Sequence, residues 1–199
     1  MRIVPRPLLI ALLCLAWLLP GLIGHDPWKP DEAYTFGAVY EILQGGSWVI
    51  PQLAGEPFID KPPLFYLSAA ASALLFSPIL PLHDAARLVV GFYIGLALLF
   101  IALASRELHG EHHGLKAALL LLGCLGLVVR GHQLIADIAA LAGFAMAYYG
   151  AALAARRAVP GGFWLGTACG LGFMVQGIPE AAMIAVSSRA SFRTEFTRC

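Results

Sequence analysis

Charged side chains are scarce in this sequence. Only 13% of its 199 residues are Asp, Glu, Lys or Arg, whereas 59% are hydrophobic and the mean hydropathy is +0.77. Soluble domains carry about 25% charged residues. The shortage of charge therefore excludes an ordinary soluble domain, and it predicts an all-α, multi-span membrane protein in contact with a lipid bilayer.

Several signatures of known chemistry are missing as well. The four cysteines are far apart in the sequence, which argues against a disulfide framework or a zinc site. The sequence contains neither a glycine-rich phosphate loop of the Walker or dinucleotide type nor a Gly-x-Ser-x-Gly motif. The net charge of +1 argues neither for nor against a nucleic-acid partner, but the basic residues form no stripe, so we predict no nucleic-acid binding.

Long apolar runs are abundant. The segments that we expect to span the membrane are 8–24, 86–105, 115–129, 138–155 and 163–186. The last of these is interrupted by Gly177-Ile178-Pro179-Glu180. Another apolar run, 64–76, is shorter than the roughly twenty residues that a spanning helix needs. We predict that this run is a juxtamembrane or re-entrant helix.

The distribution of charge predicts an orientation. If 64–76 does not span, one side of the membrane holds these basic residues: Arg2, Arg6, Arg106, Lys116, Arg156 and Arg157. The other side holds the remaining unusual polar residues: Asp31, Lys61, Arg130 and Asp137. The positive-inside rule makes the first side cytoplasmic. The sequence thus predicts an inner-membrane protein with a cytoplasmic N-terminus and an external loop at about 25–85.

The external loop contains the first candidates for chemistry, in the interval 31–63. Asp31 and Glu32 open a short helical pattern, so they fit either an acidic pair that favours the helix dipole or a general base or metal-water ligand. Lys61 follows Asp60 and precedes two prolines. Lysine at such a position can bind a phosphate as a point charge, or it can extend toward lipid head groups.

A second polar spot precedes the segment 138–155. Asp137 lies where that span begins, and Arg130 and His132 lie shortly before it. An ionisable group at this depth indicates a functional site, although an acid that caps a helix start also fits. Arg130 can pair with Asp137 or bind a phosphate. The histidine-rich segment 109–113 matches no strong zinc pattern, which argues against a metal site there.

Taken together, four stretches resemble one family. They are Asp31-Glu32-Ala33-Tyr34, Gly46-Ser47-Trp48-Val49-Ile50-Pro51, Gly55-Glu56-Pro57-Phe58 and Lys61-Pro62-Pro63-Leu64. In this order and spacing they resemble the first external loop of the aminoarabinose transferase and protein O-mannosyltransferase superfamily, and Arg130 to Asp137 resembles its second. These GT-C glycosyltransferases transfer a sugar from a polyprenyl-phosphate donor to an acceptor hydroxyl outside the cytoplasm.

The resemblance implies a fold and roles for residues. It covers about 2–180, the N-terminal part of the family's membrane module, with juxtamembrane helices in the first external loop. Asp31 corresponds to the catalytic acid that activates or orients the acceptor hydroxyl, and Asp137 supports it from the second loop. Lys61 and Arg130 correspond to donor-phosphate-binding residues. The supporting residues are Glu32, Tyr34 and Asp60. No cofactor is certain, and a divalent metal remains open.

The chain also departs from the family. Members continue much further and carry Lys-Gly-Pro where this chain has Gln176-Gly177-Ile178-Pro179, and many aminoarabinose-type members have a basic residue near the position of Tyr34. The polar stretch 187–199 is a break in composition, and we expect it to be a disordered or aberrant tail. We therefore expect 1–186 to be a partial module, inactive or nearly so by itself.

Two other interpretations remain open. A small transporter or channel subunit would use Arg130 and Asp137 as an intramembrane charge pair, although the polar residues are expected at one membrane face rather than at mid-depth. A truncated, non-catalytic membrane protein would keep the fold without activity. Neither the sugar nor the acceptor, whether lipid A, protein or another glycan, follows from the sequence.

Overall fold

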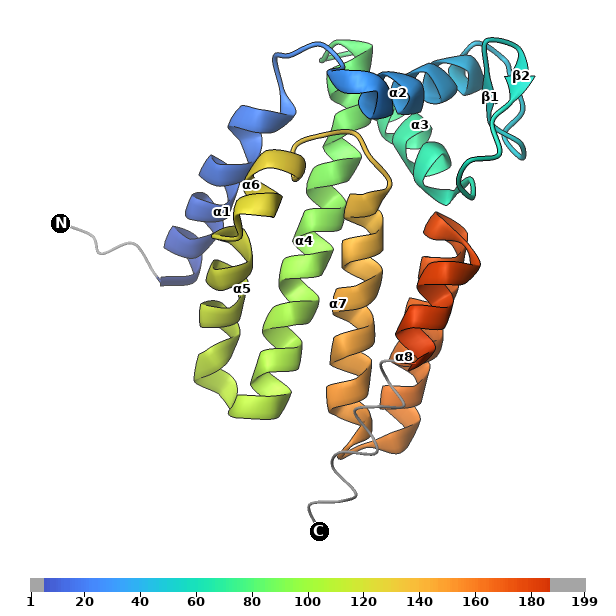
Figure 1. The fold of residues 1–199 in the computed structure, drawn as a ribbon. Coiled ribbons are helices and arrows are strands. Elements are labelled where there is room, and N and C mark those ends of the chain that lie inside the picture. Colours follow the sequence, from blue (N-terminus) through green and yellow to red (C-terminus); the bar gives the residue numbers. More distant parts are fainter. Residues whose placement is uncertain (1–5, 187–199) are drawn as a thin grey trace, which may run out of the picture.

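The computed structural model describes residues 6–186, so the predicted tail at 187–199 lies outside the described residues. Within 6–186 the regular secondary structure is helical apart from one small hairpin (Figure 1). The elements in order are α1 (Arg6–Leu22), α2 (Lys29–Leu43), β1 (Gln52–Leu53), β2 (Glu56–Pro57), α3 (Leu64–Phe76), α4 (Leu82–His109), η1 (Glu111–His113), α5 (Gly114–Leu122), α6 (Leu125–Arg130), α7 (Asp137–Ala154) and α8 (Ala158–Gln176). A further helix covers 178–186. The predicted all-α fold class is confirmed.

Three helices of the described part are long and apolar enough to span a membrane, namely α4, α7 and α8. They realise the predicted spans at 86–105 and 138–155 and the first part of the one at 163–186. α7 packs between α4 and α8, while α1 and α5 lie on the other side of α4 (Figure 1). The apolar helices α1 and α3 are shorter than these three, so the span predicted at 8–24 and the non-spanning run predicted at 64–76 both stay predictions.

Small residues allow α7 and α8 to approach closely. A Cβ atom added at Gly161 of α8 would stand 2.4 Å from the Cα of Ala154, and one added at Gly150 of α7 would stand 2.8 Å from the backbone nitrogen of Leu165. Both distances are shorter than van der Waals contact. Glycine at these positions therefore sets the spacing between the two helices.

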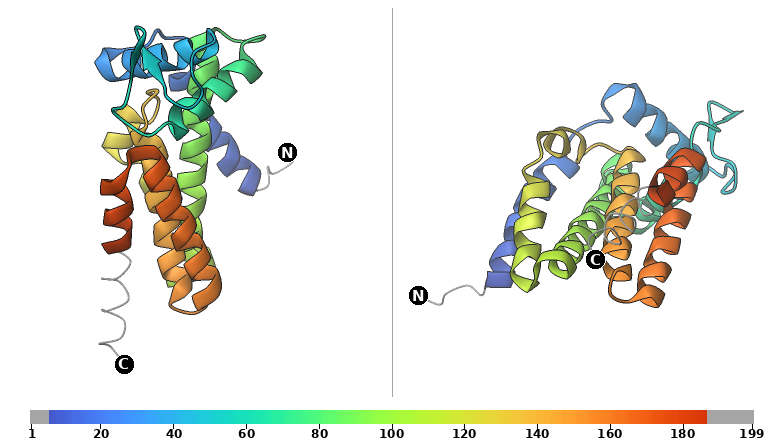
Figure 2. Two further views of the ribbon diagram at one scale, coloured as in Figure 1. Left: turned by 90° about the vertical axis from the view of Figure 1, so that its right-hand side faces the viewer. Right: turned by 60° about the horizontal axis from the view of Figure 1, so that its bottom comes forward.

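Two predicted spans are interrupted in the structure. The segment 115–129 is divided into α5 and α6, which are separated at Gly123 and Cys124. The segment 163–186 ends its first helix at Gly177, whose φ is +82°, and helix 178–186 then runs back alongside α8 (Figure 2). Positive φ at Gly177 and the missing N–H of Pro179 both oppose one continuous helix.

One end of the bundle is covered by α2, α3 and the hairpin (Figure 1). α2 confirms the predicted short helix, which stops at Gly45, where φ is +97°. The hairpin was not predicted. Its turn residues Ala54 and Gly55 both have positive φ, which matches the twist of a two-residue hairpin turn. The backbone N–H of Gly55 donates to Glu41 of α2 at 3.1 Å, so the hairpin is held on that helix.

The opposite end of the bundle carries basic residues. α4 ends there, α5 begins there, and the connection from α7 to α8 lies there too (Figure 1). Arg157 lies 3.8 Å from Glu107, and Arg106 lies 3.9 Å from Glu111. Of the basic residues predicted for the cytoplasmic side, Arg106 and Arg157 therefore lie at this end, away from the end that α2 and α3 cover.

Candidate active site

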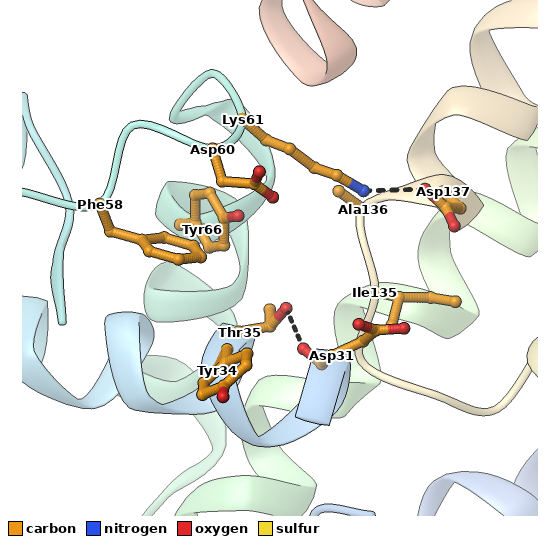
Figure 3. A pocket seen from close by; sticks show the side chains of 10 residues that line it. All are labelled: Asp31, Tyr34, Thr35, Phe58, Asp60, Lys61, Tyr66, Ile135, Ala136 and Asp137. Carbon is orange, nitrogen blue, oxygen red and sulfur yellow. Dashed lines mark hydrogen bonds and ion pairs between the residues drawn. The ribbon is translucent and has the colours of Figure 1, made fainter. Parts of the chain in front are cut away.

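A cavity of about 230 Å³ opens at the end of the bundle that α2 and α3 cover (Figure 3). Its walls come from α2, from the segment that leads into α3, and from the loop that leads into α7. The lining residues are Asp31, Tyr34, Thr35, Phe58, Asp60, Lys61, Tyr66, Ile135, Ala136 and Asp137. Five of the seven sequence-predicted site residues are among them.

Lys61 and Asp137 meet on one wall of this cavity. The Lys61 Nζ donates to Asp137 Oδ1 at 2.9 Å, although the two residues lie 76 positions apart (Figure 3). The side-chain amide of Gln176 donates to the same oxygen at 2.7 Å, and the Arg130 guanidinium lies 3.5 Å from Oδ2. Asp137 thus gathers two cations and one amide. Arg130 does not line the cavity, and it reaches the site only through Asp137.

The position of Lys61 follows from its neighbours. Pro62 and Pro63 restrict the backbone, and Pro63 is the N-cap of α3. The lysine is consequently fixed at a helix start and extends across the cavity toward α7 (Figure 3). Its side chain is 28% exposed, so the ammonium remains open to a ligand in the cavity.

Asp31 faces the cavity from the first turn of α2. Pro30 precedes it near the start of this helix, and the Thr35 hydroxyl donates to the Asp31 backbone carbonyl at 2.8 Å. Among the residues whose side chains the structure describes (12–28 and 30–186), none forms a hydrogen bond or an ion pair with the Asp31 carboxylate. Asp31 is exposed, so its carboxylate is available to a substrate hydroxyl.

Aromatic residues form much of the remaining wall. Phe58 and Tyr66 make an edge contact with ring centroids 5.8 Å apart, and Tyr34 is exposed at the cavity. Burial, and then the negative charge of Asp60, raise the pKa of the Tyr66 hydroxyl. The hydroxyl therefore stays protonated and can donate a hydrogen bond into the cavity. The sequence analysis did not select Tyr66.

Glu32 lies outside the cavity and is only 1% exposed. Arg87 of α4 donates its Nε to Glu32 Oε1 at 2.9 Å and its Nη1 to Asp84 at 2.8 Å. Glu32 also accepts the backbone N–H of Trp28 and that of Leu134, each at 2.9 Å. It therefore supports the site by joining α2, α4 and the loop before α7.

Arg87 and Asp84 were not identified from the sequence. Arg87 is completely buried, and its Nη1 also donates to the carbonyl of His25 at 3.0 Å. Asp84 Oδ2 accepts the backbone N–H of Gly24. A signal was present, since an arginine inside a predicted apolar span needs a partner. This network fixes the backbone on both sides of Asp31.

The described residues contain no group of three or more His, Cys, Asp or Glu side chains that could hold a metal ion. Asp137, which faces the cavity, is already bound to Lys61. The histidine-rich segment likewise forms no such group within 6–186. The arrangement of the described side chains gives no support to a resident metal.

Among curated proteins, sequence relatives of this chain are named as arabinosyl transferases, whereas no family model matches it. The undecaprenyl phosphate-α-4-amino-4-deoxy-L-arabinose arabinosyl transferase 1 of Sodalis glossinidius is 33% identical over 191 residues, which is 90% of this chain and 34% of that protein. The transferase of the same name from Serratia proteamaculans is 32% identical over 190 residues. The chain spans about a third of the length of these relatives.

Solved structures show the same fold. ArnT from Cupriavidus metallidurans in the apo state matches 97% of this chain with a TM-score of 0.83 and 18% identity, over 36% of its own length. The structure of that protein bound to undecaprenyl phosphate matches 88% of this chain with a TM-score of 0.80. The resemblance to the aminoarabinose transferases is thereby confirmed: this chain is similar, in sequence and in fold, to about a third of these membrane glycosyltransferases.

Proposed function

We propose that this chain provides the donor-phosphate side of an active site that transfers a sugar from a polyprenyl-phosphate donor to an acceptor hydroxyl. The observation that carries the proposal is the contact of Lys61 with Asp137 on the wall of a cavity that Asp31 also faces. The names of the sequence relatives support it, because each is an arabinosyl transferase named for undecaprenyl phosphate. Acceptor and sugar remain to be identified.

Each charged group has a physical role in this reaction. When the anomeric carbon is attacked, negative charge accumulates on the departing phosphate, and Lys61 would stabilise it. Arg130 lies outside the cavity, so it would act only through its contact with Asp137. Asp137 would aim Lys61 at the phosphate through their 2.9 Å contact. The Asp31 carboxylate, which faces the cavity, would accept the hydroxyl proton of the acceptor, which makes the acceptor oxygen a better nucleophile.

We further propose that the protein lies in the cell inner membrane with the cavity on the periplasmic side. The basic residues Arg106, Arg156 and Arg157 lie at the end of the bundle away from the cavity, where the positive-inside rule places the cytoplasm. A lipid-linked donor stays in the bilayer, so a site at the membrane surface suits it. The same placement disfavours a transport path, which would need its polar residues at mid-depth.

A chimeric enzyme tests the proposed transfer. Residues 6–186 of this chain would replace the matching segment of the Sodalis glossinidius relative, and release of undecaprenyl phosphate from its aminoarabinose-linked form would be measured in membranes. We expect transfer by the chimera. Asp31→Asn and Lys61→Met should each lower the rate by at least about 100-fold, the usual scale for losing a catalytic proton acceptor or a charge stabiliser.

The control for this experiment is Glu56→Gln. Glu56 is exposed on the hairpin and does not line the cavity. This variant should transfer at the rate of the parent chimera, with equal membrane insertion in all samples. Full activity of the Asp31→Asn and Lys61→Met chimeras would contradict the assigned roles.

A further inference from the structure

Glu180 is a buried acid without a partner. It lies in helix 178–186, just beyond the turn at Gly177, and it is only 4% exposed. Neither of its carboxyl oxygens has a hydrogen-bond partner among the described residues. Burying an ionised carboxylate without a partner costs several kcal/mol, so such a group tends to be neutral or to bind something.

Two glycines make room for this carboxyl group. A Cβ added at Gly143 of α7 would stand 3.1 Å from Glu180 Oε1, and one added at Gly172 of α8 would stand 3.2 Å from its Cγ. The side chain thus occupies a narrow slot between the two helices. Any larger residue at either glycine would compete with Glu180 for this space.

The slot lies next to the Lys61–Asp137 contact. Gln176, which donates to Asp137 at 2.7 Å, is separated from Glu180 only by the turn at Gly177. A Cβ at Gly177 would stand 3.8 Å from Pro62, the residue after Lys61. Helix 178–186 therefore packs directly behind the wall of the cavity.

Few charged groups face Glu180. Asp137 faces it from α7 and Lys61 from the segment before α3, whereas α8 has no charged residue between Ala158 and Gln176. Burial raises the pKa of Glu180 to about 7; the charge of Asp137 adds to this rise, and Lys61 opposes it. Glu180 lies outside the candidate spans α4, α7 and α8. Its charge can therefore change near neutral pH.

We propose that Glu180 is a positioning residue of the donor-phosphate site, and that its carboxyl must be neutral for Lys61 to be fully available to the phosphodiester of the donor. This inference rests on the proposed function. Ionised Glu180 would add a negative charge directly behind a site that binds an anion, and it would compete with the ligand for the Lys61 ammonium. Asp31 and Asp60 also face the cavity, but nothing in this proposal depends on their titration.

The sign of the pH dependence follows from this arrangement. Below pH 7 the neutral acid leaves Lys61 to Asp137 and the ligand. As pH rises through about 7, Glu180 loses its proton and phosphodiester affinity should fall. In a medium of intermediate dielectric, one added charge near a bound anion changes its affinity on the order of 10-fold.

The test measures binding of a polyprenyl phosphate methyl ester to the 199-residue chain in lipid nanodiscs between pH 5.5 and 8.5. A phosphodiester is the right probe, because its single charge does not titrate in this range. We expect the wild-type affinity to fall by about 10-fold over the range. Glu180→Gln should bind as tightly at pH 8.5 as at pH 5.5, while Glu56→Gln should follow the wild-type profile.

The outcomes separate this inference from the proposed function. Binding by Glu180→Gln with the wild-type pH profile contradicts the inference alone. Absence of binding by every variant at every pH contradicts the proposed function and this inference with it. If Glu180→Gln does not fold, the infrared carbonyl band of a protonated acid is measured in the wild type instead. A band lost between pH 6 and 8.5 supports the inference, and its absence at pH 6 overturns it.

Discussion

Arg87 forms ion pairs with two carboxylates in the interior of the protein. It is 0% exposed and pairs with Glu32 of α2 and Asp84 of α4 at 2.9 and 2.8 Å. A buried ion pair contributes little net stability as a whole, because both charges lose their hydration. Removing one partner is costly, since the remaining charge is left unpaired. The network thus specifies one arrangement of the backbone around Asp31.

Replacement of this arginine tests that view. Arg87→Met should lower the free energy of unfolding by about 3–5 kcal/mol, because two carboxylates stay buried without a counter-charge. Thermal unfolding in detergent measures the change. Arg156→Met is the matched control, since Arg156 is exposed, and it should unfold like the wild type. An Arg87→Met protein with wild-type thermal stability would contradict the role assigned to the network.

Single residues of the site were predictable to different degrees. Asp31, Lys61 and Asp137 stand out in the sequence because each is an ionisable residue at the edge of an apolar run. The cavity contains all three. Arg87 was overlooked because its partner Glu32 lies 55 positions away, and such a pairing depends on how the helices pack rather than on local pattern. Tyr66 was not selected because, in the sequence, it is one of several aromatic residues in or beside an apolar run.

Among the elements, the packing of α7 on α8 depends on positions without side chains. At Gly161 a Cβ would be placed 2.4 Å from the backbone of Ala154, whereas at its neighbour Gly162 nothing lies within 4 Å. Both glycines occupy the same helix. They differ in environment but not in secondary structure, so they form a matched pair for substitution.

Gly161→Ala should destabilise the protein by about 1–3 kcal/mol, because the added methyl group pushes the two helices apart. Gly162→Ala should be neutral or stabilising by up to about 1 kcal/mol, since alanine favours helix over glycine. Chemical unfolding in mixed micelles, followed by circular dichroism, measures both. Equal effects of the two substitutions would show that the close approach is not needed.

The helices were predicted best where apolar pattern and stop signals agree. The short helical pattern that Asp31 and Glu32 open and the run 64–76 match α2 (Lys29–Leu43) and α3. Boundaries inside apolar runs were missed, as at Gly123 between α5 and α6. Hydropathy does not change there, so only the backbone reveals the break. The hairpin was not predicted, because strands of two residues are too short to show an alternating pattern of polar and apolar residues.

For the whole molecule, the separation of charge predicts how it lies in the membrane. Glu56 is exposed at the cavity end, and Glu111 is exposed at the opposite end. With native cysteines replaced by alanine, Glu56→Cys should react with a membrane-impermeant maleimide added to cells with a permeabilised outer membrane. Glu111→Cys should react only after the inner membrane is lysed. The reverse pattern would invert the proposed orientation.

The contact between Lys61 and Asp137 joins the segment before α3 to the start of α7. This contact is the basis of the proposed function. The most direct measurement is the affinity of the 199-residue chain for a polyprenyl phosphate in nanodiscs. Lys61→Met should weaken binding by about 10- to 100-fold, the value of a charged hydrogen bond. Lys116→Met, at the opposite end, should bind like the wild type; equal affinities for wild type and Lys61→Met would contradict the account.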